Sequence, residues 1–234
     1  MITGAAFCPQ APLLVPAVAA GAAAELDELR AACRIAIQKV AATGTQVVLI
    51  GDGATSQVHS ALARGTLQGF GVDLEIHLGS PSCGGALELP PSLTVGAWLV
   101  ADALGPRSFA MGCSVGPDFA SSRAAAQLLG MAQDGDLALI VLGDGSARMS
   151  TTAPGYLDER AEGFEASVLS ALISGDGAAL EGLDASLGQQ LLTAGVPAWQ
   201  VAGGLLAGTR FGAEVSYHDA PYGVDYFVAT WLPE

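Results

Sequence analysis

Apolar positions along this chain follow two different periods. Short continuous apolar runs, such as Leu137–Leu142 (LALIVL), are typical of strands buried on both faces. The alternation of Val72, Leu74, Ile76 and Leu78 with polar or small neighbours predicts a half-buried strand. The strands expected from these patterns are Gln46–Ile50, Val72–Leu78, Ser108–Cys113, Leu137–Leu142, Glu214–Tyr217 and Val224–Val228.

Helical spacing separates most of these strands. The segment Glu25–Ala42 places apolar residues three and four positions apart, which puts them on one helix face. Its acidic first turn, Lys39 in its last turn and the following Gly44 all suit the helix dipole and a helix end. The helices expected from such patterns are Glu25–Ala42, Ser92–Leu104, Ser121–Gln133, Asp158–Ile173, Ala185–Ala194 and Pro197–Ala207.

The alternation of strands and helices predicts an α/β fold. We expect a three-layer sandwich in which helices cover both faces of a mainly parallel central sheet. No stretch rich in Pro, Gly and Ser divides the chain, so residues 1–234 are expected to form a single domain.

Composition excludes several classes of protein. With 51% hydrophobic and 14% charged residues the chain has enough apolar material for a core, which argues against disorder. The longest apolar stretch, Ala11–Ala24, is interrupted by Pro12, Pro16 and Gly21, whereas a membrane span needs about 20 apolar residues. The residues after Met1 lack the basic start of a signal peptide. We therefore expect a cytoplasmic protein with no membrane partner.

The charge balance is strongly acidic. Nine basic residues face 23 acidic ones, and the net charge is −14. Because the basic residues are scattered, no stripe is available to neutralise phosphates, and nucleic acid is not an expected partner. The four cysteines show no CxxC spacing and are expected to be buried, reduced thiols.

Two strands run into the same tripeptide, Gly-Asp-Gly, at Gly51–Gly53 and Gly143–Gly145. In open α/β sheets ligands bind beyond the carboxyl ends of strands, so these turns would place Asp52 and Asp144 at one edge. Their glycines would let a backbone approach a ligand closely. The simpler interpretation is that Gly and Asp are good turn residues after any strand.

A Gly-x-Ser-x-Gly motif at Gly112–Gly116 raises the possibility of a serine nucleophile. Asp144 and His218 follow Ser114 in the order of an α/β-hydrolase triad. The next helix is expected only at Ser121, so the sharp strand-to-helix elbow is missing. His59 and His77 are expected to be surface or packing residues, and no histidine spacing is typical of a metal site. Of the histidines, His218 with its neighbour Asp219 is the better candidate for a functional role.

Four ordered segments resemble the class III extradiol ring-cleavage dioxygenase (LigB-like) superfamily, which includes the Memo proteins. Phe7–Pro16 resembles the opening "PHPPLLVP" segment, and Val47–Gly53 resembles the strand that ends in "SPH". Gly143–Arg148 resembles "GDxSHR", and Ser216–Val228 resembles "SYEGPFGVGYxVA". The resemblance covers nearly the whole chain and implies the LigB/Memo-like α/β fold.

The same resemblance implies a degenerate active site. The family binds Fe(II) through two histidines and a glutamate, and these positions fall on Gln10, Gly53 and Asp219. The family's acid/base histidine falls on Ala147. An amide is a weak ligand for Fe(II) and glycine is none, so neither bound iron nor extradiol cleavage is expected. No catalytic residue is assigned, and no cofactor is expected.

Four functions stay open. The favoured one is a binding protein for a small molecule or a protein, with Arg148 beside Ser146 holding a carboxylate or phosphate. An arginine that pairs with Asp144 or Asp158 is the structural alternative. A second is a metal-dependent enzyme, with hydrolysis as one candidate reaction, in which Asp52, Asp144 and Asp219 with Gln10 bind Mg²⁺, Mn²⁺ or Ca²⁺. A third is a protein-interaction scaffold, for which self-association as a homo-oligomer is one option. Residual ring cleavage is the remaining alternative. The candidate ligand-binding residues are Gln10, Asp52, Gly53, Asp144, Ser146, Arg148, His218 and Asp219.

Overall fold

A seven-stranded sheet forms the centre of the computed structural model, which describes residues 2–41, 46–79, 86–105, 110–117 and 135–234. The strand order is β3-β6-β2-β7-β1-β9-β8. The four neighbours β6, β2, β7 and β1 are parallel. At one edge β3 pairs antiparallel with β6, and at the other β9 pairs antiparallel with both β1 and β8. The mixed α/β class is as expected, but the parallel part of the sheet is confined to its four central strands.

The strands of this sheet are β1 (Ile2–Cys8), β2 (Gln46–Asp52), β3 (Gln57–His59), β6 (Ala110–Val115), β7 (Leu137–Leu142), β8 (Phe211–Asp219) and β9 (Tyr226–Pro233). A separate pair consists of β4 (Arg64–Thr66) and β5 (Glu75–His77). The α-helices are α1 (Pro16–Ala19), α2 (Asp27–Ala41), α3 (Pro91–Leu104), α5 (Arg160–Ser174), α6 (Gly177–Glu181), α7 (Ala185–Gln190) and α8 (Val196–Leu206). Short 3-10 helices are Pro12–Leu14, Ala20–Leu26 and Gln68–Phe70.

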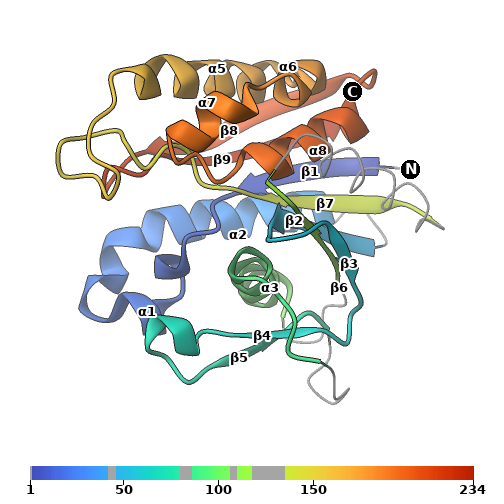
Figure 1. Cartoon of the computed structure of the whole chain (residues 1–234). Helices are drawn as coiled ribbons and strands as arrows, with labels where there is room; N and C mark the ends of the chain where they lie inside the picture. Colours follow the sequence, from blue (N-terminus) through green and yellow to red (C-terminus); the bar gives the residue numbers. More distant parts are fainter. Residues whose placement is uncertain (1, 42–45, 80–85, 106–109, 118–134) are drawn as a thin grey trace.

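Helices cover both faces of the sheet, which gives three layers (Figure 1). On one face α8 packs against β7 and α5 against β8 and β9, in a core that includes Leu139 and Val141. On the other face α2 and α3 pack against β7 in a core that includes Ile140 and Leu142. Every residue of β7 is fully buried, because alternate side chains enter the two cores. This explains why the run LALIVL is continuous rather than alternating.

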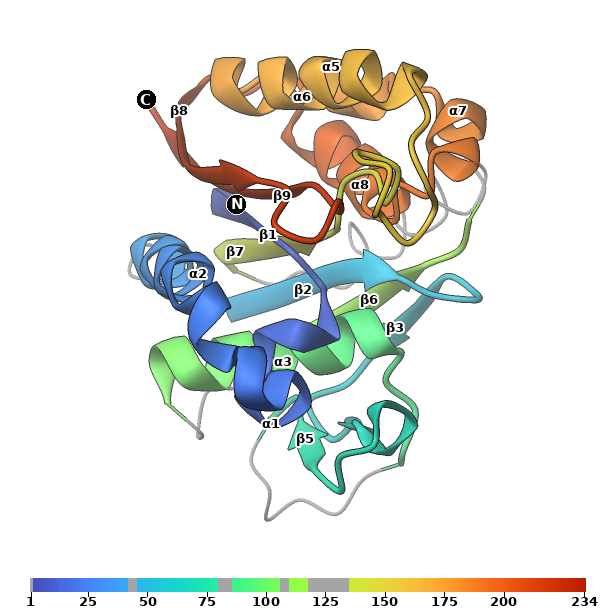
Figure 2. The same ribbon diagram turned by 90° about the vertical axis from the view of Figure 1, so that its left-hand side faces the viewer.

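Two expected elements are shorter in the structure. Only Glu75–His77 of the segment Val72–Leu78 forms a strand, and it pairs with β4 in a small sheet on the outer side of α3 (Figures 1 and 2). Helix α7 ends at Gln190 instead of Ala194, because Leu192 has a left-handed backbone with φ of 56°. The helix expected at Ser121–Gln133 lies outside the described residues.

The other expected helices and strands are present with shifted ends. The C-terminal strands are longer than predicted, since β8 and β9 form a hairpin that extends to Pro233. Within the described ranges, no helix combines the length and the apolar character needed to cross a membrane.

Candidate functional site

A cavity of about 350 Å³ lies where the parallel strands β2 and β6 end. The segment from α7 to the start of α8 forms its opposite wall. The lining is mostly apolar, with a few polar side chains. Its residues are Asp52, Gly53, Val115, Pro117, Ala185, Gln189, Leu192, Thr193, Ala194, Val196 and Pro197. This position, beyond the carboxyl ends of parallel strands, is where open α/β sheets bind ligands.

Gln10 joins the two Gly-Asp-Gly turns at this edge. Its backbone N–H donates to Asp144 Oδ1 at 2.8 Å, and its side-chain Nε2 donates to Asp52 Oδ1 at 2.8 Å. Gln10 is 9% exposed, and its Oε1 is buried without a hydrogen-bond partner. The end of β2 is fixed as well, since Ser92 Oγ donates to the Asp52 carbonyl at 2.6 Å. The structure therefore brings Gln10, Asp52 and Asp144 together.

Both carboxyl groups hold their protons more tightly than usual. Burial raises the pKa of Asp144 to about 7, and the nearby charge of Asp52 acts in the same direction. Burial also raises the pKa of Asp52, opposed by the hydrogen bond from Gln10. Asp52, which lines the cavity, offers a hydrogen-bond acceptor to a ligand that carries a hydroxyl, an ammonium group or a cation.

Asp219 is not part of this cluster. It is exposed at the end of β8, two strands from β1, and its Oδ1 accepts from the backbone N–H of Ala220 at 2.8 Å. Among the described residues, no three His, Cys, Asp or Glu side chains are grouped to hold a metal ion. The predicted set of Asp52, Asp144 and Asp219 is therefore wrong as a three-carboxylate site.

The positions that the family resemblance assigns to Fe(II) do not offer the ligands that iron requires. Gln10 presents an amide, and Gly53 has no side chain. A Cβ on Gly53 would lie 2.8 Å from Ser114 Cβ, so this position is too crowded for an imidazole without rearrangement. Ala147 has no titratable group in place of the acid/base histidine. This donor set does not fit the family's iron centre.

Ser146 belongs to a buried network behind the cavity wall. Its Oγ donates to the Leu191 carbonyl at 2.7 Å, and its backbone N–H donates to Glu165 Oε1 at 2.9 Å. Thr193, which lines the cavity, donates to the same Glu165 oxygen at 3.1 Å. Ser146 is fully buried, so it positions the wall and is not placed to touch a ligand directly.

Glu165 was not among the predicted site residues, although the sequence carried a signal for it. It lies on the buried stripe of α5 with Ala161, Val168 and Leu172, where a charged residue is unusual. Burial raises its pKa to about 8, and the negative charge of Asp225 adds to the effect. The carboxyl group is therefore mostly protonated at neutral pH.

His218 pairs with Asp225 instead of its neighbour Asp219. Its Nε2 lies 3.1 Å from Asp225 Oδ1, and its ring stacks on Phe227 with centroids 4.7 Å apart. Asp225 is 1% exposed, and burial raises its pKa while His218 lowers it. His218 is thus the side-chain partner of a buried carboxyl group, which gives this candidate ligand-binding residue a structural role.

The serine of the Gly-x-Ser-x-Gly motif has a different partner from the one expected. Ser114 Oγ lies 3.0 Å from Nε2 of His59, and not beside His218. Ser114 is 3% exposed and His59 is 2% exposed, and Ser114 Oγ also donates to the Thr55 carbonyl at 2.9 Å. The hydrolase order Ser114, Asp144, His218, which the missing elbow already argued against, is not assembled in the structure, and in this conformation the hydroxyl is closed to a substrate.

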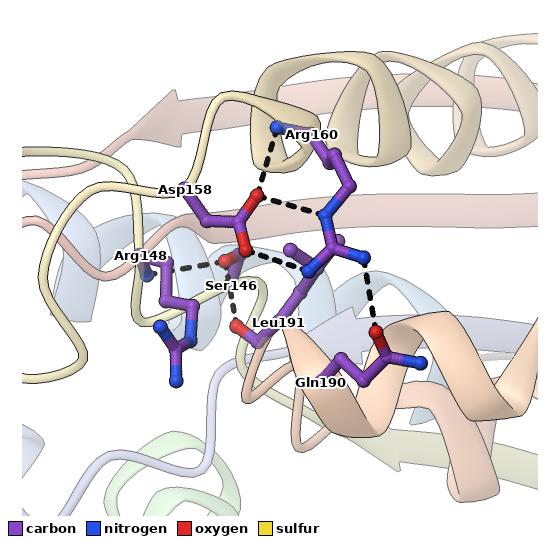
Figure 3. Close-up of polar contacts among 6 residues, drawn as sticks. All are labelled: Ser146, Arg148, Asp158, Arg160, Gln190 and Leu191. Atoms are coloured by element: carbon purple, nitrogen blue, oxygen red, sulfur yellow. Dashed lines mark hydrogen bonds and ion pairs between the residues drawn. The ribbon is translucent and has the colours of Figure 1, made fainter.

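Arg148 forms no ion pair with Asp144 or Asp158, the partners expected for a structural arginine, although its charge helps to lower the pKa of Asp158. Asp158 is engaged by Arg160, whose Nη2 lies 2.7 Å from Asp158 Oδ2 and whose Nε donates to Oδ1 at 3.0 Å. In Figure 3 the Arg148 guanidinium points away from both residues. Its Nε is buried and has no hydrogen-bond partner in the part of the chain that the structure describes.

The described cysteines agree with the expectation of buried thiols. Cys8, Cys33 and Cys113 are free and buried, and burial raises the pKa of Cys113 to about 12. Cys83 lies outside the described residues.

Comparison with known proteins supports the fold only. No protein-family model matches the chain, and no curated protein matches it. The crystal structure of the uncharacterized protein JW3007 from Escherichia coli K12 is similar, with a TM-score of 0.52 and 12% sequence identity. The match covers 98% of this chain and 99% of that chain. At this identity the likeness concerns the arrangement of helices and strands and carries no statement about activity.

Proposed function

We propose that this protein binds a small organic molecule in the cavity at the carboxyl edge of its parallel strands. The observation that carries the proposal is the cavity itself, about 350 Å³ with apolar walls and few polar groups. Binding sites for small molecules have this composition, because apolar walls supply most of the affinity and a few polar atoms orient the ligand. Asp52, which lines the cavity and is held by the hydrogen bond from Gln10, is the orienting acceptor.

The proposal includes descent from the LigB-like superfamily with loss of ring cleavage. Its supports are the four ordered segments of the sequence and the position of Gln10 and Gly53 at one edge of the sheet. Ring cleavage needs a metal that binds the aromatic diol and dioxygen together, and Gln10, Gly53 and Ala147 do not provide for it. Binding without this chemistry is the function that these residues favour.

Filling the cavity tests the proposal. A thermal-shift screen of small aromatic and aliphatic molecules is run on the wild-type protein and on Ala194→Leu, whose added side chain enters the cavity. Ala166→Leu on the exposed face of α5 is the matched control. Compounds that raise the melting temperature of the wild type and of the control by several degrees are expected to lose this effect in Ala194→Leu. Equal shifts in all three proteins would contradict binding in this cavity.

A divalent cation is a second candidate ligand, favoured by the unpartnered Gln10 oxygen beside two carboxyl groups of raised pKa. Hard cations such as Mg²⁺ and Mn²⁺ prefer oxygen ligands of this kind. Calorimetric titration with Mn²⁺ is expected to show binding to the wild type and to Asp73→Asn, an exposed control. Asp144→Asn is expected to weaken it at least ten-fold. No heat in the millimolar range would exclude this candidate.

A further inference from the structure

The guanidinium of Arg148 carries a positive charge in a chain of net charge −14, and Asp158, a carboxyl group whose pKa it helps to lower, is already paired with Arg160. Neither a hydrogen bond nor an ion pair of this guanidinium is present among the described residues, and its Nε is buried without a partner. Leaving a charged donor unsatisfied costs more than leaving a neutral one. An arginine in this state is suited to an anion that comes from outside the chain.

The backbone on either side of Arg148 is held firmly in place. Its own N–H donates to Ser146 Oγ at 3.1 Å, and its carbonyl accepts from the backbone N–H of Asp158 at 3.1 Å. The next residue, Met149, donates to the Gly223 carbonyl at 3.2 Å. The position of the side chain is therefore set before a ligand arrives, which lowers the entropy cost of binding.

Gly155 connects Arg148 to the cavity. A Cβ on this glycine would lie 2.8 Å from Arg148 Cγ and 2.6 Å from Leu192 Cδ1, and Leu192 lines the cavity. Leu192 is 47% exposed and provides apolar surface near the stem of Arg148, while Tyr156, the neighbour of Gly155 in the chain, is 74% exposed. Both have positive φ, at 58° and 56°. Strained residues persist where the surrounding structure requires them, as at ligand sites.

Resting on the proposed function, we infer that Arg148 forms the anion-binding end of this site and that the ligand is an organic acid, a carboxylate or a phosphate. The planar guanidinium fork binds either group through paired hydrogen bonds. The apolar body of the ligand enters the cavity between Val115, Val196 and Leu192. The acid group stays at the rim, because Asp52 inside the cavity would repel it.

Matched acidic and neutral probes test this assignment. Phenylacetate, phenyl phosphate and the neutral phenylacetamide are titrated by calorimetry into the wild type, Arg148→Gln and Arg210→Gln. Arg210 is an exposed arginine ahead of β8 and serves as the control. At least one acid is expected to bind the wild type and the control equally and to bind Arg148→Gln about ten-fold more weakly or worse. Phenylacetamide affinity is expected to be the same in all three proteins.

A second variant and the salt dependence separate this role from a structural one. Arg148→Lys keeps the charge but lacks the fork, and is expected to bind the acids with intermediate affinity. Acid binding by the wild type is expected to weaken as NaCl rises, because the charge at the rim is partly exposed to solvent. Arg148→Gln should unfold at the wild-type temperature, since the side chain makes no hydrogen bond.

The outcomes distinguish the two proposals. Acids that bind wild type and Arg148→Gln equally, or an amide that binds where acids do not, would overturn the role of Arg148 and leave the cavity as a binding site. If no probe binds and the screen that compares wild type with Ala194→Leu also finds no ligand, both proposals fail.

Discussion

Buried carboxyl groups are the residues with the most specific physical consequences in this molecule. Glu165 is 2% exposed, lies close enough to Asp225 to feel its charge, and accepts two hydrogen bonds on Oε1 but none on Oε2. Gly145 makes this arrangement possible, since a Cβ there would lie 2.6 Å from Glu165 Oε2. Glu165 lies on α5 and Asp225 directly before β9, so the two carboxyl groups meet where these elements approach each other. This place is directly behind the cavity wall, because Thr193 of that wall donates to Glu165.

Glu165 should make the protein less stable as the pH rises. Its pKa is raised from 4.5 to about 8 in the folded state, so between these values the unfolded chain releases a proton that the folded chain retains. The free energy of unfolding therefore falls by about 1.4 kcal/mol per pH unit in this window from this group alone. Glu165→Gln keeps an oxygen for Ser146 and Thr193 and removes the titration. Urea unfolding at pH 5, 6.5 and 8 should show a flatter profile for the variant, with its largest gain at pH 8.

Glu162→Gln is the control, because Glu162 is exposed on the same helix. It should follow the wild-type profile. A Glu165→Gln protein that keeps the full wild-type pH dependence would show that this carboxyl group is not protonated in the folded state.

At the scale of elements, the sequence predicts those strands whose burial is uniform. Leu137–Leu142 and Val47–Ile50 are apolar throughout because both faces are covered, and the structure has them in β7 and β2. Strand β1 gave no such signal, since Gly4, Ala5 and Ala6 are small. They are small because the chain is crowded there: a Cβ on Gly4 would lie 3.1 Å from the Trp231 carbonyl of β9. Close packing of strands thus removed the pattern by which the strand is recognised.

The contact between β7 and α8 depends on a pair of glycines. A Cβ on Gly143 would lie 2.4 Å from the Cα of Gly195, and the N–H of Gly195 donates to the Asp144 carbonyl at 2.9 Å. Backbone cannot retreat as a flexible side chain can, so Gly143→Ala should destabilise the protein by about 2–3 kcal/mol. Gly163→Ala is the matched control, because a Cβ at that exposed position of α5 meets nothing within 4 Å. It should be stabilising by about 0.5–1 kcal/mol. Chemical denaturation of both variants checks the pair, and equal stabilities would refute the contact.

At the scale of the whole molecule, the sheet edge could be predicted and the cavity wall could not. Gly-Asp-Gly after two buried strands places Asp52 and Asp144 at the carboxyl edge, because parallel strands end together. Gln10 emerged from a family resemblance, and its bridging hydrogen bonds appear only in the structure. The wall built from Thr193, Leu192 and Glu165 depends on contacts between α5 and the segment after α7. Such contacts join residues far apart in the chain and leave no local pattern.

The acidic surface makes a prediction for the whole chain. Because the chain has 23 acidic and nine basic residues, folding brings like charges together, and their repulsion lowers the free energy of unfolding. Raising NaCl from about 0.02 to 0.5 M shortens the Debye length from roughly 20 Å to about 4 Å, so the melting temperature at pH 7.5 should rise by several degrees. Near pH 4.3, the isoelectric point of the sequence, the net charge vanishes and the same salt step should have little effect. Scanning calorimetry at both pH values compares the two steps. A salt effect of equal size at pH 4.3 and pH 7.5 would mean that net repulsion does not limit stability, because the net charge of the chain is near zero at the first pH and strongly negative at the second.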